Sequence, residues 1–331
     1  MALRVVATGG TIASLTDPQT GIARPVVGAE ELVASVPGLE ALGPVEVEQV
    51  AHVNGWNVTP EIMLEVAQRI AAAQQDPSVD GVLVTHGTDT VEETAFLCDI
   101  TVAAPKPVAF AVAMRTGGEI SADGPRNLLD AARLITHPDA QRLGAVVVLS
   151  NEAHAARWVR KQHSFRPSAL VSYGRGPIAQ VTPTAVTALI AELPRVALEL
   201  PSALDRPVPI VQTFTGMEEQ LLPAVVEATG AAGLVLEGTG SGNVPGSAEA
   251  GIKGALDRGI PVVIATRAPA GGTAPVYGGP GGGATLRDLG VIEAGRLSAA
   301  KARLLLMVLL AHGLSAWQVI GRFREALDAL G

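Results

Sequence analysis

Short runs of aliphatic and β-branched residues alternate with stretches of helical periodicity through the first half of the chain. Buried strands are predicted over 3–7, 45–50, 81–85, 108–112 and 145–149. Helical spacing occupies the intervals 29–36, 60–73, 90–102 and 124–136, with Thr59 as an N-cap before Pro60. Strands that alternate with helices form parallel sheets with helices on both faces. The pattern therefore predicts an α/β fold.

The second half repeats this alternation on a smaller scale, with strands predicted over 210–214, 233–236 and 261–265 and a helix pair over 298–330. The chain has 331 residues, more than the roughly 250–300 that one hydrophobic core usually serves. A proline-punctuated stretch separates the halves. We therefore expect a larger N-terminal domain over 1–182 with a mostly parallel sheet flanked by helices. A linker over 183–207 and a smaller α/β domain with a parallel sheet over 208–331 should follow.

Composition and charge narrow the classes of function. Hydrophobic residues make up 48% of the chain and charged residues 17%, which is typical of a globular protein. A net charge of −8 argues against nucleic acid, whose phosphates require clustered Lys and Arg. The apolar run 304–311 is too short to span a bilayer, the first residues show no secretory signal, and the single Cys98 fits core packing in a reducing compartment. We expect a soluble cytoplasmic protein that binds a small neutral or zwitterionic molecule.

The first predicted strand runs into the segment ATGGTIA at 7–13. Two glycines allow a tight turn and leave the hydroxyl of Thr11 exposed, so Thr11 is a candidate nucleophile. The alternative is a phosphate-binding turn of a nucleotide-binding domain. The GxGxxG spacing and the P-loop lysine of such turns are both missing here.

A second polar cluster, HGTDT at 86–90, follows the third predicted strand. Thr88 offers another hydroxyl, and Asp89 offers a carboxylate that can pair with a substrate ammonium group, although either residue could equally serve as an ordinary helix cap. A threonine nucleophile needs a base, and no Ser-His-Asp elbow is visible. A partly buried lysine can act as that base, because burial favours the neutral amine.

The segments ATGGTIA and VTHGTDTVEETA together resemble the two threonine motifs of the bacterial-type L-asparaginase/glutaminase family. The likeness extends along the chain through SADGPRNL at 121–128, AARWVRK ending at Lys161, GTGSGNVP at 238–245 and a late KARLLL. The resemblance implies an L-asparaginase, an amidohydrolase that converts L-asparagine to L-aspartate and ammonia through an acyl-enzyme. Weak glutaminase activity is left open.

The resemblance also implies residue roles. Thr11 would attack the side-chain amide carbon, and Thr88, Lys161 and Asp89 would form a second, supporting triad. The substrate α-ammonium would bind Asp89, with support from Asn243 in the second domain. Backbone N–H groups at Thr88 and Ala113 would form an oxyanion hole.

The chain departs from the family pattern around this expected site. Many members grip the substrate α-carboxylate with a Ser-Gln pair, where this chain has Gly55 and Trp56. Asn54 or Asn57 could supply the missing donor, and Trp56 could narrow the pocket, so we count Gly55, Trp56 and Asn57 as candidate substrate contacts. The expected flap over 16–27 lacks the tyrosine of well-studied members, and a glycine-rich stretch at 277–283 replaces an acidic residue that some relatives supply from a neighbouring subunit.

No metal and no cofactor are expected, because the six histidines are scattered and there is one cysteine. Family resemblance implies a homodimer or homotetramer whose substrate is a small molecule, with no nucleic-acid or membrane partner. Two other readings stay open, a hydrolase of another small amide and an amino-acid-binding protein that has lost catalysis. The related subunit that supplies ammonia for tRNA charging carries an additional N-terminal domain, and the acidic charge also disfavours that role.

Overall fold

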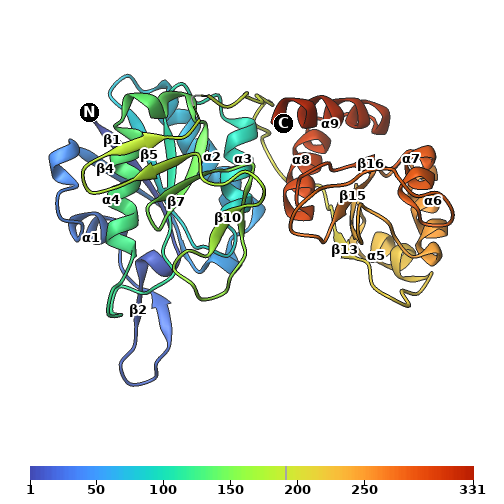
Figure 1. Ribbon diagram of the computed structural model, residues 1–331, viewed down its shortest axis with the longest axis horizontal. Helices are drawn as coiled ribbons and strands as arrows, with labels where there is room; N and C mark the ends of the chain where they lie inside the picture. The colour runs from blue at the N-terminus through green and yellow to red at the C-terminus, as the bar shows by residue number, and fades with distance from the viewer. Residues whose placement is uncertain (191) are drawn as a thin grey trace. The chain divides into compact units, whose positions relative to one another are not determined.

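The computed structural model describes residues 1–190 and 192–331 and comprises two compact units, Met1–Leu200 and Pro201–Gly331 (Figure 1). Both units are α/β, and the larger one comes first, which confirms the predicted fold class. The division lies inside the expected linker 183–207, although residues 186–188 of that segment form a strand of the first unit.

An eight-stranded sheet forms the centre of the first unit, in the order β12-β11-β8-β7-β6-β5-β1-β4. The run from β7 to β4 is parallel, whereas β8, β11 and β12 join it by antiparallel pairing. The strands are β1 (Leu3–Gly9), β4 (Val45–Val53), β5 (Gly81–Thr85), β6 (Val108–Ala111), β7 (Ala145–Leu149), β8 (Glu152–Ala155), β11 (Ala179–Val181) and β12 (Val186–Ala188).

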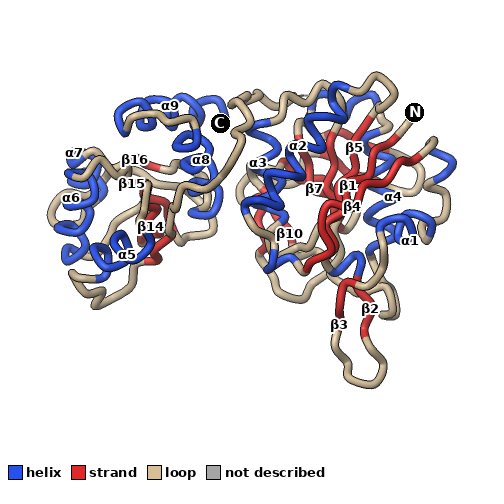
Figure 2. Tube along the Cα trace, turned by 180° about the vertical axis from the view of Figure 1, so that it is seen from behind, coloured by secondary structure: helices blue, strands red, loops and turns tan. Residues whose placement is uncertain are grey.

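Helices cover both faces of this sheet (Figure 2). Successive residues of a strand point to opposite faces, so Val5 and Leu83 join one buried cluster while the adjacent Val6 and Val84 join another. The first cluster is completed by α1 (Ala29–Ala34) and α4 (Gly124–Ile135), the second by α2 (Pro60–Gln75) and α3 (Val91–Thr101). A strand buried on both faces reads as a continuous apolar run, which explains why β5 and β7 were predicted with their observed bounds.

The strand order reverses at β1, which has β4 on one side and β5 on the other. Loops that leave the carboxyl ends of two such strands diverge and create a crevice where ligands bind. The segment after β1 carries Thr11, and the segment after β5 carries Thr88 and Asp89. The topology therefore brings both threonine motifs to the same edge of the sheet.

Two small antiparallel hairpins accompany this edge. The strands β2 (Ser14–Thr16) and β3 (Ala23–Pro25) form a projecting hairpin that begins two residues before the expected flap over 16–27 and otherwise lies in it (Figures 1 and 2). A 2.9 Å contact between the hydroxyls of Thr16 and Thr116 holds the end of β2. The other hairpin pairs β9 (Val159–Lys161) with β10 (Leu170–Ser172), which places Lys161 at a strand end. Neither hairpin was predicted from the sequence.

The second unit contains a four-stranded parallel sheet in the order β13-β14-β15-β16. Helices α5, α6 and α7 pack into one buried cluster with the sheet, while α8 contacts β13, β14 and β15. The elements are β13 (Ile210–Gln212), β14 (Leu234–Gly238), β15 (Val262–Thr266), β16 (Ile292–Glu293), α5 (Leu221–Thr229), α6 (Glu249–Asp257), α7 (Gly283–Leu289), α8 (Ala299–Ala311) and α9 (Ala316–Leu330).

Several local predictions can be compared directly with the structure. The Thr59 hydroxyl accepts a hydrogen bond from the N–H of Ile62, so the predicted N-cap of α2 is confirmed. Cys98 is buried in α3, and the apolar run 304–311 is largely buried in α8, as expected for core segments. No helix among the described residues has the length and apolarity needed to cross a membrane.

Candidate active site

Three glycine turns interlock at the carboxyl edge of the first sheet. Gly10 has φ of +82°, and a Cβ at this residue would lie 2.4 Å from the Cα of Gly87. A Cβ on Gly87 would in turn lie 2.7 Å from the Cα of Gly55. Real Cβ atoms do not approach backbone so closely, so only glycine allows the loops after β1, β4 and β5 to meet. This contact sets the spacing between Thr11, residues 55–57 and Thr88.

Thr11 begins a short 3₁₀ turn immediately after Gly10. The turn is fixed on both sides, because Gly10 donates its N–H to the carbonyl of Val53 at 2.9 Å and its own carbonyl accepts from the Ser14 hydroxyl at 2.9 Å. Thr11 is half-buried, whereas Ile12 beside it is buried. Thr11 therefore lies on a turn that is hydrogen-bonded on both sides, at the carboxyl edge of the sheet.

Lys161 reaches the second threonine motif from the β9 hairpin. Its Nζ donates a 2.8 Å hydrogen bond to the hydroxyl of Thr88 and a 2.6 Å hydrogen bond to Oδ1 of Asp89. Thr88 is 4% exposed, and the side chains of Lys161 and Asp89 are 19% and 41% exposed. A hydroxyl, an amine and a carboxylate thus form a connected group that remains reachable from solvent.

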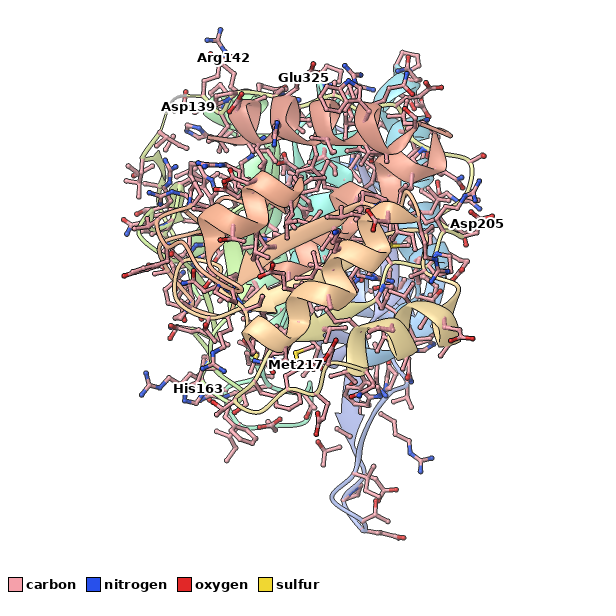
Figure 3. The ribbon with its side chains drawn as sticks, turned by 90° about the vertical axis from the view of Figure 1, so that its right-hand side faces the viewer. Asp139, Arg142, His163, Asp205, Met217 and Glu325 are labelled. Atoms are coloured by element: carbon pink, nitrogen blue, oxygen red, sulfur yellow. The ribbon has the colours of Figure 1, made fainter. Side chains whose placement is uncertain are left out.

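Glu92 and the loop after Lys161 complete the wall of an open hollow beside this group. The hollow is lined by Asp89, Glu92, Lys161, Gln162, His163 and Ser164. His163, labelled in Figure 3, accepts hydrogen bonds at Nδ1 from the N–H groups of Phe165 and Arg166, at 3.0 and 3.1 Å. Its ring shapes the loop that follows Lys161.

The imidazole of His86 supports the second turn from inside the unit. Its ring nitrogens lie 2.8 Å from the carbonyl of Gly87 and 2.9 Å from the hydroxyl of Thr94. Because a carbonyl only accepts, Nδ1 carries the proton and Nε2 accepts from Thr94. Burial lowers the pKa of His86 to about 4 despite its bond to the Gly87 carbonyl, so the ring is neutral near pH 7.

Ala113 lies just after β6 in a loop that the segment SADGPRNL holds in place. The Asp123 carboxylate accepts from the N–H groups of Met114 and Arg115, at 3.1 and 2.9 Å. The Asn127 side chain donates to the carbonyl of Val112 at 2.8 Å. Asp123 and Asn127 were not among the predicted site residues, although their segment was part of the family resemblance.

The loop after β4 carries the candidate carboxylate contacts. Thr90 donates to the carbonyl of Gly55 at 2.7 Å and so joins this loop to the start of α3. Gly55 is buried, Trp56 is 67% exposed and Asn57 is also exposed. Trp56 is therefore available to a ligand rather than buried in the core.

Asn243 belongs to the second unit, where it follows β14. Its Oδ1 accepts from the N–H of Gly283, the first residue of α7, at 3.0 Å, and its backbone carbonyl accepts from the N–H of Thr239 at 2.8 Å. These bonds hold it at the carboxyl edge of the second sheet. Its predicted role toward Asp89 stays a prediction.

The first unit thus gathers Thr11, Thr88, Asp89, Lys161 and Ala113 with the Gly55 loop at one sheet edge. The group contains two hydroxyls, an amine in contact with one of them and a carboxylate, which are side chains that nucleophilic catalysis can use. Within residues 1–190 and 192–331, no cluster of three or more His, Cys, Asp or Glu side chains is arranged to hold a metal ion.

Comparison with known proteins agrees with this architecture. Residues 2–192 match the family model "Asparaginase, N-terminal", and residues 207–323 match the "Glutaminase/Asparaginase C-terminal domain". A probable L-asparaginase of Deinococcus radiodurans is 39% identical over 95% of this chain and 94% of its own length. L-asparaginase 2 of Bacillus subtilis is 32% identical over 98% and 86%.

A solved structure gives the same result. The crystal structure of a probable cytoplasmic L-asparaginase from Campylobacter jejuni superimposes with a TM-score of 0.87 at 29% identity, covering 97% of this chain and 98% of that protein. Both family models, the two relatives and the shared fold agree over nearly the whole chain. The protein therefore belongs to the L-asparaginase/glutaminase family of amidohydrolases.

Proposed function

We propose that this enzyme hydrolyses the side-chain amide of L-asparagine to L-aspartate and ammonia. The observation that carries the proposal is the contact of Lys161 Nζ with both the Thr88 hydroxyl and the Asp89 carboxylate, in a chain of this family. Such a group can activate a hydroxyl or a water while its carboxylate binds a substrate ammonium.

In the proposed reaction Thr11 Oγ bonds to the amide carbon, the C–N bond breaks with proton transfer to nitrogen, and ammonia leaves an ester on Thr11. Water then attacks the ester, releases L-aspartate and restores the hydroxyl. Thr88 and the Lys161 amine relay the proton that the attacking Thr11 hydroxyl or water gives up, and it passes first to the leaving nitrogen and then, in the second step, to the Thr11 oxygen. Backbone N–H groups at Thr88 and Ala113 stabilise the oxyanion, a contribution worth about a hundredfold or more in rate per donor.

In this proposal Asp89 binds the substrate α-ammonium and Asn243 supports it, while Gly55, Trp56 and Asn57 face the substrate α-carboxylate. We also propose a cytoplasmic homodimer or homotetramer, which size-exclusion chromatography with light scattering would resolve.

The direct test is ammonia release from L-asparagine and L-glutamine, measured side by side. Thr11→Ala and Thr88→Ala should each lower kcat by about a thousandfold or more, since each removes a reacting or proton-transferring hydroxyl. Thr11→Ser is the matched control, because it retains a hydroxyl and should keep measurable turnover. Full activity of Thr11→Ala would refute the threonine mechanism.

A second candidate is hydrolysis of another small amide by the same residues. It is favoured by Trp56, which is 67% exposed in the loop where many relatives carry a Ser-Gln pair. A panel of amino-acid amides separates the two candidates. A kcat/KM for another amide at least tenfold above that for asparagine would select this alternative.

A further inference from the structure

Glu92 contacts the backbone of Lys161, and this contact has no part in the proposed mechanism. It lies in the first turn of α3, and its Oε2 accepts a 2.7 Å hydrogen bond from the backbone N–H of Lys161. The same side chain lines the hollow that also contains Asp89. The bond therefore ties the end of β9 to the start of α3.

Residues 88–92 therefore hold Lys161 at both its backbone and the end of its side chain. Its backbone N–H binds Glu92, while its Nζ binds Thr88 and Asp89 at 2.8 and 2.6 Å. A lysine side chain has four rotatable bonds, so its amine is placed accurately only if the backbone from which it starts is also fixed. β9 is three residues long and pairs with β10 rather than with the main sheet.

A purely local role for Glu92 is the alternative. Acidic side chains in a first helical turn interact favourably with the helix dipole, and Glu92 occupies such a position in α3. That role would need only the charge of the carboxylate. The hydrogen bond to Lys161 needs an acceptor at the same place, which a neutral amide can also provide.

We infer that Glu92 is a positioning residue of the site, which holds the Lys161 backbone so that Nζ meets Thr88. This inference rests on the proposed function. A displacement of about 1 Å in a catalytic group lowers rates by on the order of a hundredfold. Loss of the acceptor should therefore reduce kcat far more than it changes KM.

The experiment compares Glu92→Met, Glu92→Ala and Glu92→Gln with the wild-type full chain. Met has nearly the length of Glu and a good helix propensity but no comparable acceptor, whereas the Gln carbonyl can accept the Lys161 N–H. Kinetics with L-asparagine are measured together with hydrogen exchange of the Lys161 amide. Glu65→Ala is the control, because Glu65 is an exposed carboxylate on α2 that pairs with Arg69.

We expect kcat to fall at least about twentyfold in the Met and Ala variants, with KM within about threefold and faster exchange of the Lys161 amide. Glu92→Gln should retain kcat within about threefold, an unchanged pH profile and slow exchange. Wild-type kcat in Glu92→Met, unchanged exchange, or a Gln variant as slow as Met would overturn the inference. Absence of turnover by the wild type would overturn the proposed function instead, and the exchange measurement, which needs no turnover, would still test the anchoring of Lys161.

Discussion

At the scale of single residues, the protonation state of His86 affects the turn that carries Thr88, because the imidazole supports that turn through hydrogen bonds. Its imidazole is fully buried, directly precedes the Gly87 turn and makes an edge-on contact with Phe110. One ring nitrogen donates to the Gly87 carbonyl and the other accepts from Thr94. A second ring proton would point at the Thr94 hydroxyl, which already donates to that nitrogen. The neutral ring therefore belongs to the folded state.

This gives a pH dependence with a definite sign. The pKa of His86 is lowered to about 4 in the folded protein, against 6.5 for the unperturbed ring. As pH falls through that window the unfolded chain takes up a proton first, so stability present above pH 6.5 is lost toward pH 4. We expect a loss of about 3 kcal/mol from this group. Urea unfolding of wild type and His86→Gln at several pH values should show a weaker pH dependence in the variant.

The contribution of His86 to the pH dependence is the difference between wild type and His86→Gln, because other groups also titrate between pH 6.5 and pH 4. His154 is also buried, and burial lowers its pKa in the same direction. Its contribution is common to both proteins and cancels. Equal pH dependence in wild type and His86→Gln would contradict the assignment.

At the scale of elements, the site depends on three turns that belong to different strands. The turns after β1, β4 and β5 touch backbone to backbone through Gly10, Gly55 and Gly87. Each strand end alone is an ordinary loop. Their close approach fixes the relative position of Thr11 and Thr88, because neither turn can move without displacing the other.

Gly10→Ala tests this arrangement. The new Cβ would meet the Gly87 backbone at 2.4 Å, at a φ of +82° that an L-residue rarely adopts. We expect a loss of at least about 2 kcal/mol in unfolding free energy and of about a hundredfold or more in kcat. Calorimetry and ammonia release measure the two effects.

Gly254→Ala is the matched control, because Gly254 lies within α6, lacks a positive φ and has no atom outside its own turn of helix within 4 Å of the position that a Cβ would take. The same substitution should there be neutral or stabilising by up to about 1 kcal/mol. Wild-type activity and stability in Gly10→Ala would show that the turns need no such close contact.

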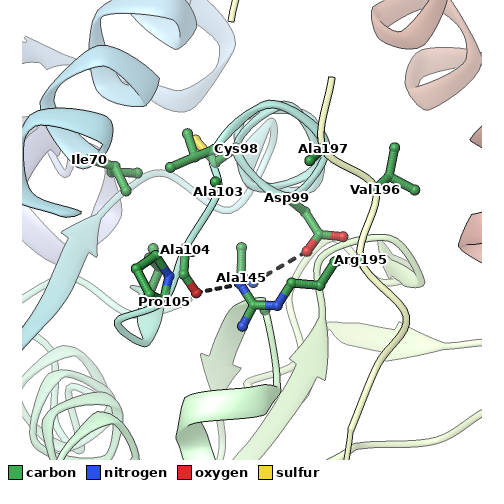
Figure 4. A pocket seen from close by; sticks show the side chains of 13 residues that line it. Ile70, Cys98, Asp99, Ala103, Ala104, Pro105, Ala145, Arg195, Val196 and Ala197 are labelled. Carbon is green, nitrogen blue, oxygen red and sulfur yellow. Dashed lines mark hydrogen bonds between the residues drawn. The ribbon is translucent and has the colours of Figure 1, made fainter. Parts of the chain in front are cut away.

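At the scale of the whole molecule, residues 195–197 lead out of the first unit along a pocket (Figure 4). This pocket lies at the amino ends of the parallel strands, opposite the edge that carries the candidate site. The pocket lies at the starts of β6 and β7 and is bordered by Asp99, Arg195 and the end of α3. Arg157 pairs with Asp99 at 2.9 Å, and both side chains are at most 3% exposed. Arg157 also donates to the carbonyl of Pro194, and Leu198 donates to that of Ile100. The segment 194–198, through which the chain leaves the first unit, is therefore hydrogen-bonded to the core of that unit.

Asp99→Asn should destabilise the protein strongly. The substitution leaves the buried guanidinium of Arg157 without its counter-charge, and breaking a buried pair in this way costs about 3–5 kcal/mol. Glu325→Gln is the control, because its pair with Arg322 is 59% and 66% exposed, so we expect a change below about 0.5 kcal/mol. Calorimetry of both variants gives the comparison. A small loss in Asp99→Asn would mean that the pair adds little to the stability of this unit.

The sequence by itself determined the α/β class, the main strands of both sheets and most of the long helices, because strands buried on both faces read as continuous apolar runs and amphipathic helices show a repeat of about 3.6 residues. The threonine motifs stood out for the same local reason, since glycines and polar residues follow strand ends. Short hairpins such as β9–β10 left no such signal, because three-residue strands are too brief for a pattern to emerge.

Only the tertiary structure decided which of these residues meet. Lys161 is far from both threonine motifs in the chain, and local spacing alone predicted nothing about it; the family resemblance suggested its role, and the folded chain brings its Nζ to Thr88. Glu92 is one of two adjacent acidic residues at the start of a helix, and only the fold places its carboxylate against the Lys161 N–H. The physical reason is that hydrophobic periodicity encodes which face of an element is buried, whereas contacts between polar side chains depend on how elements distant in sequence are packed.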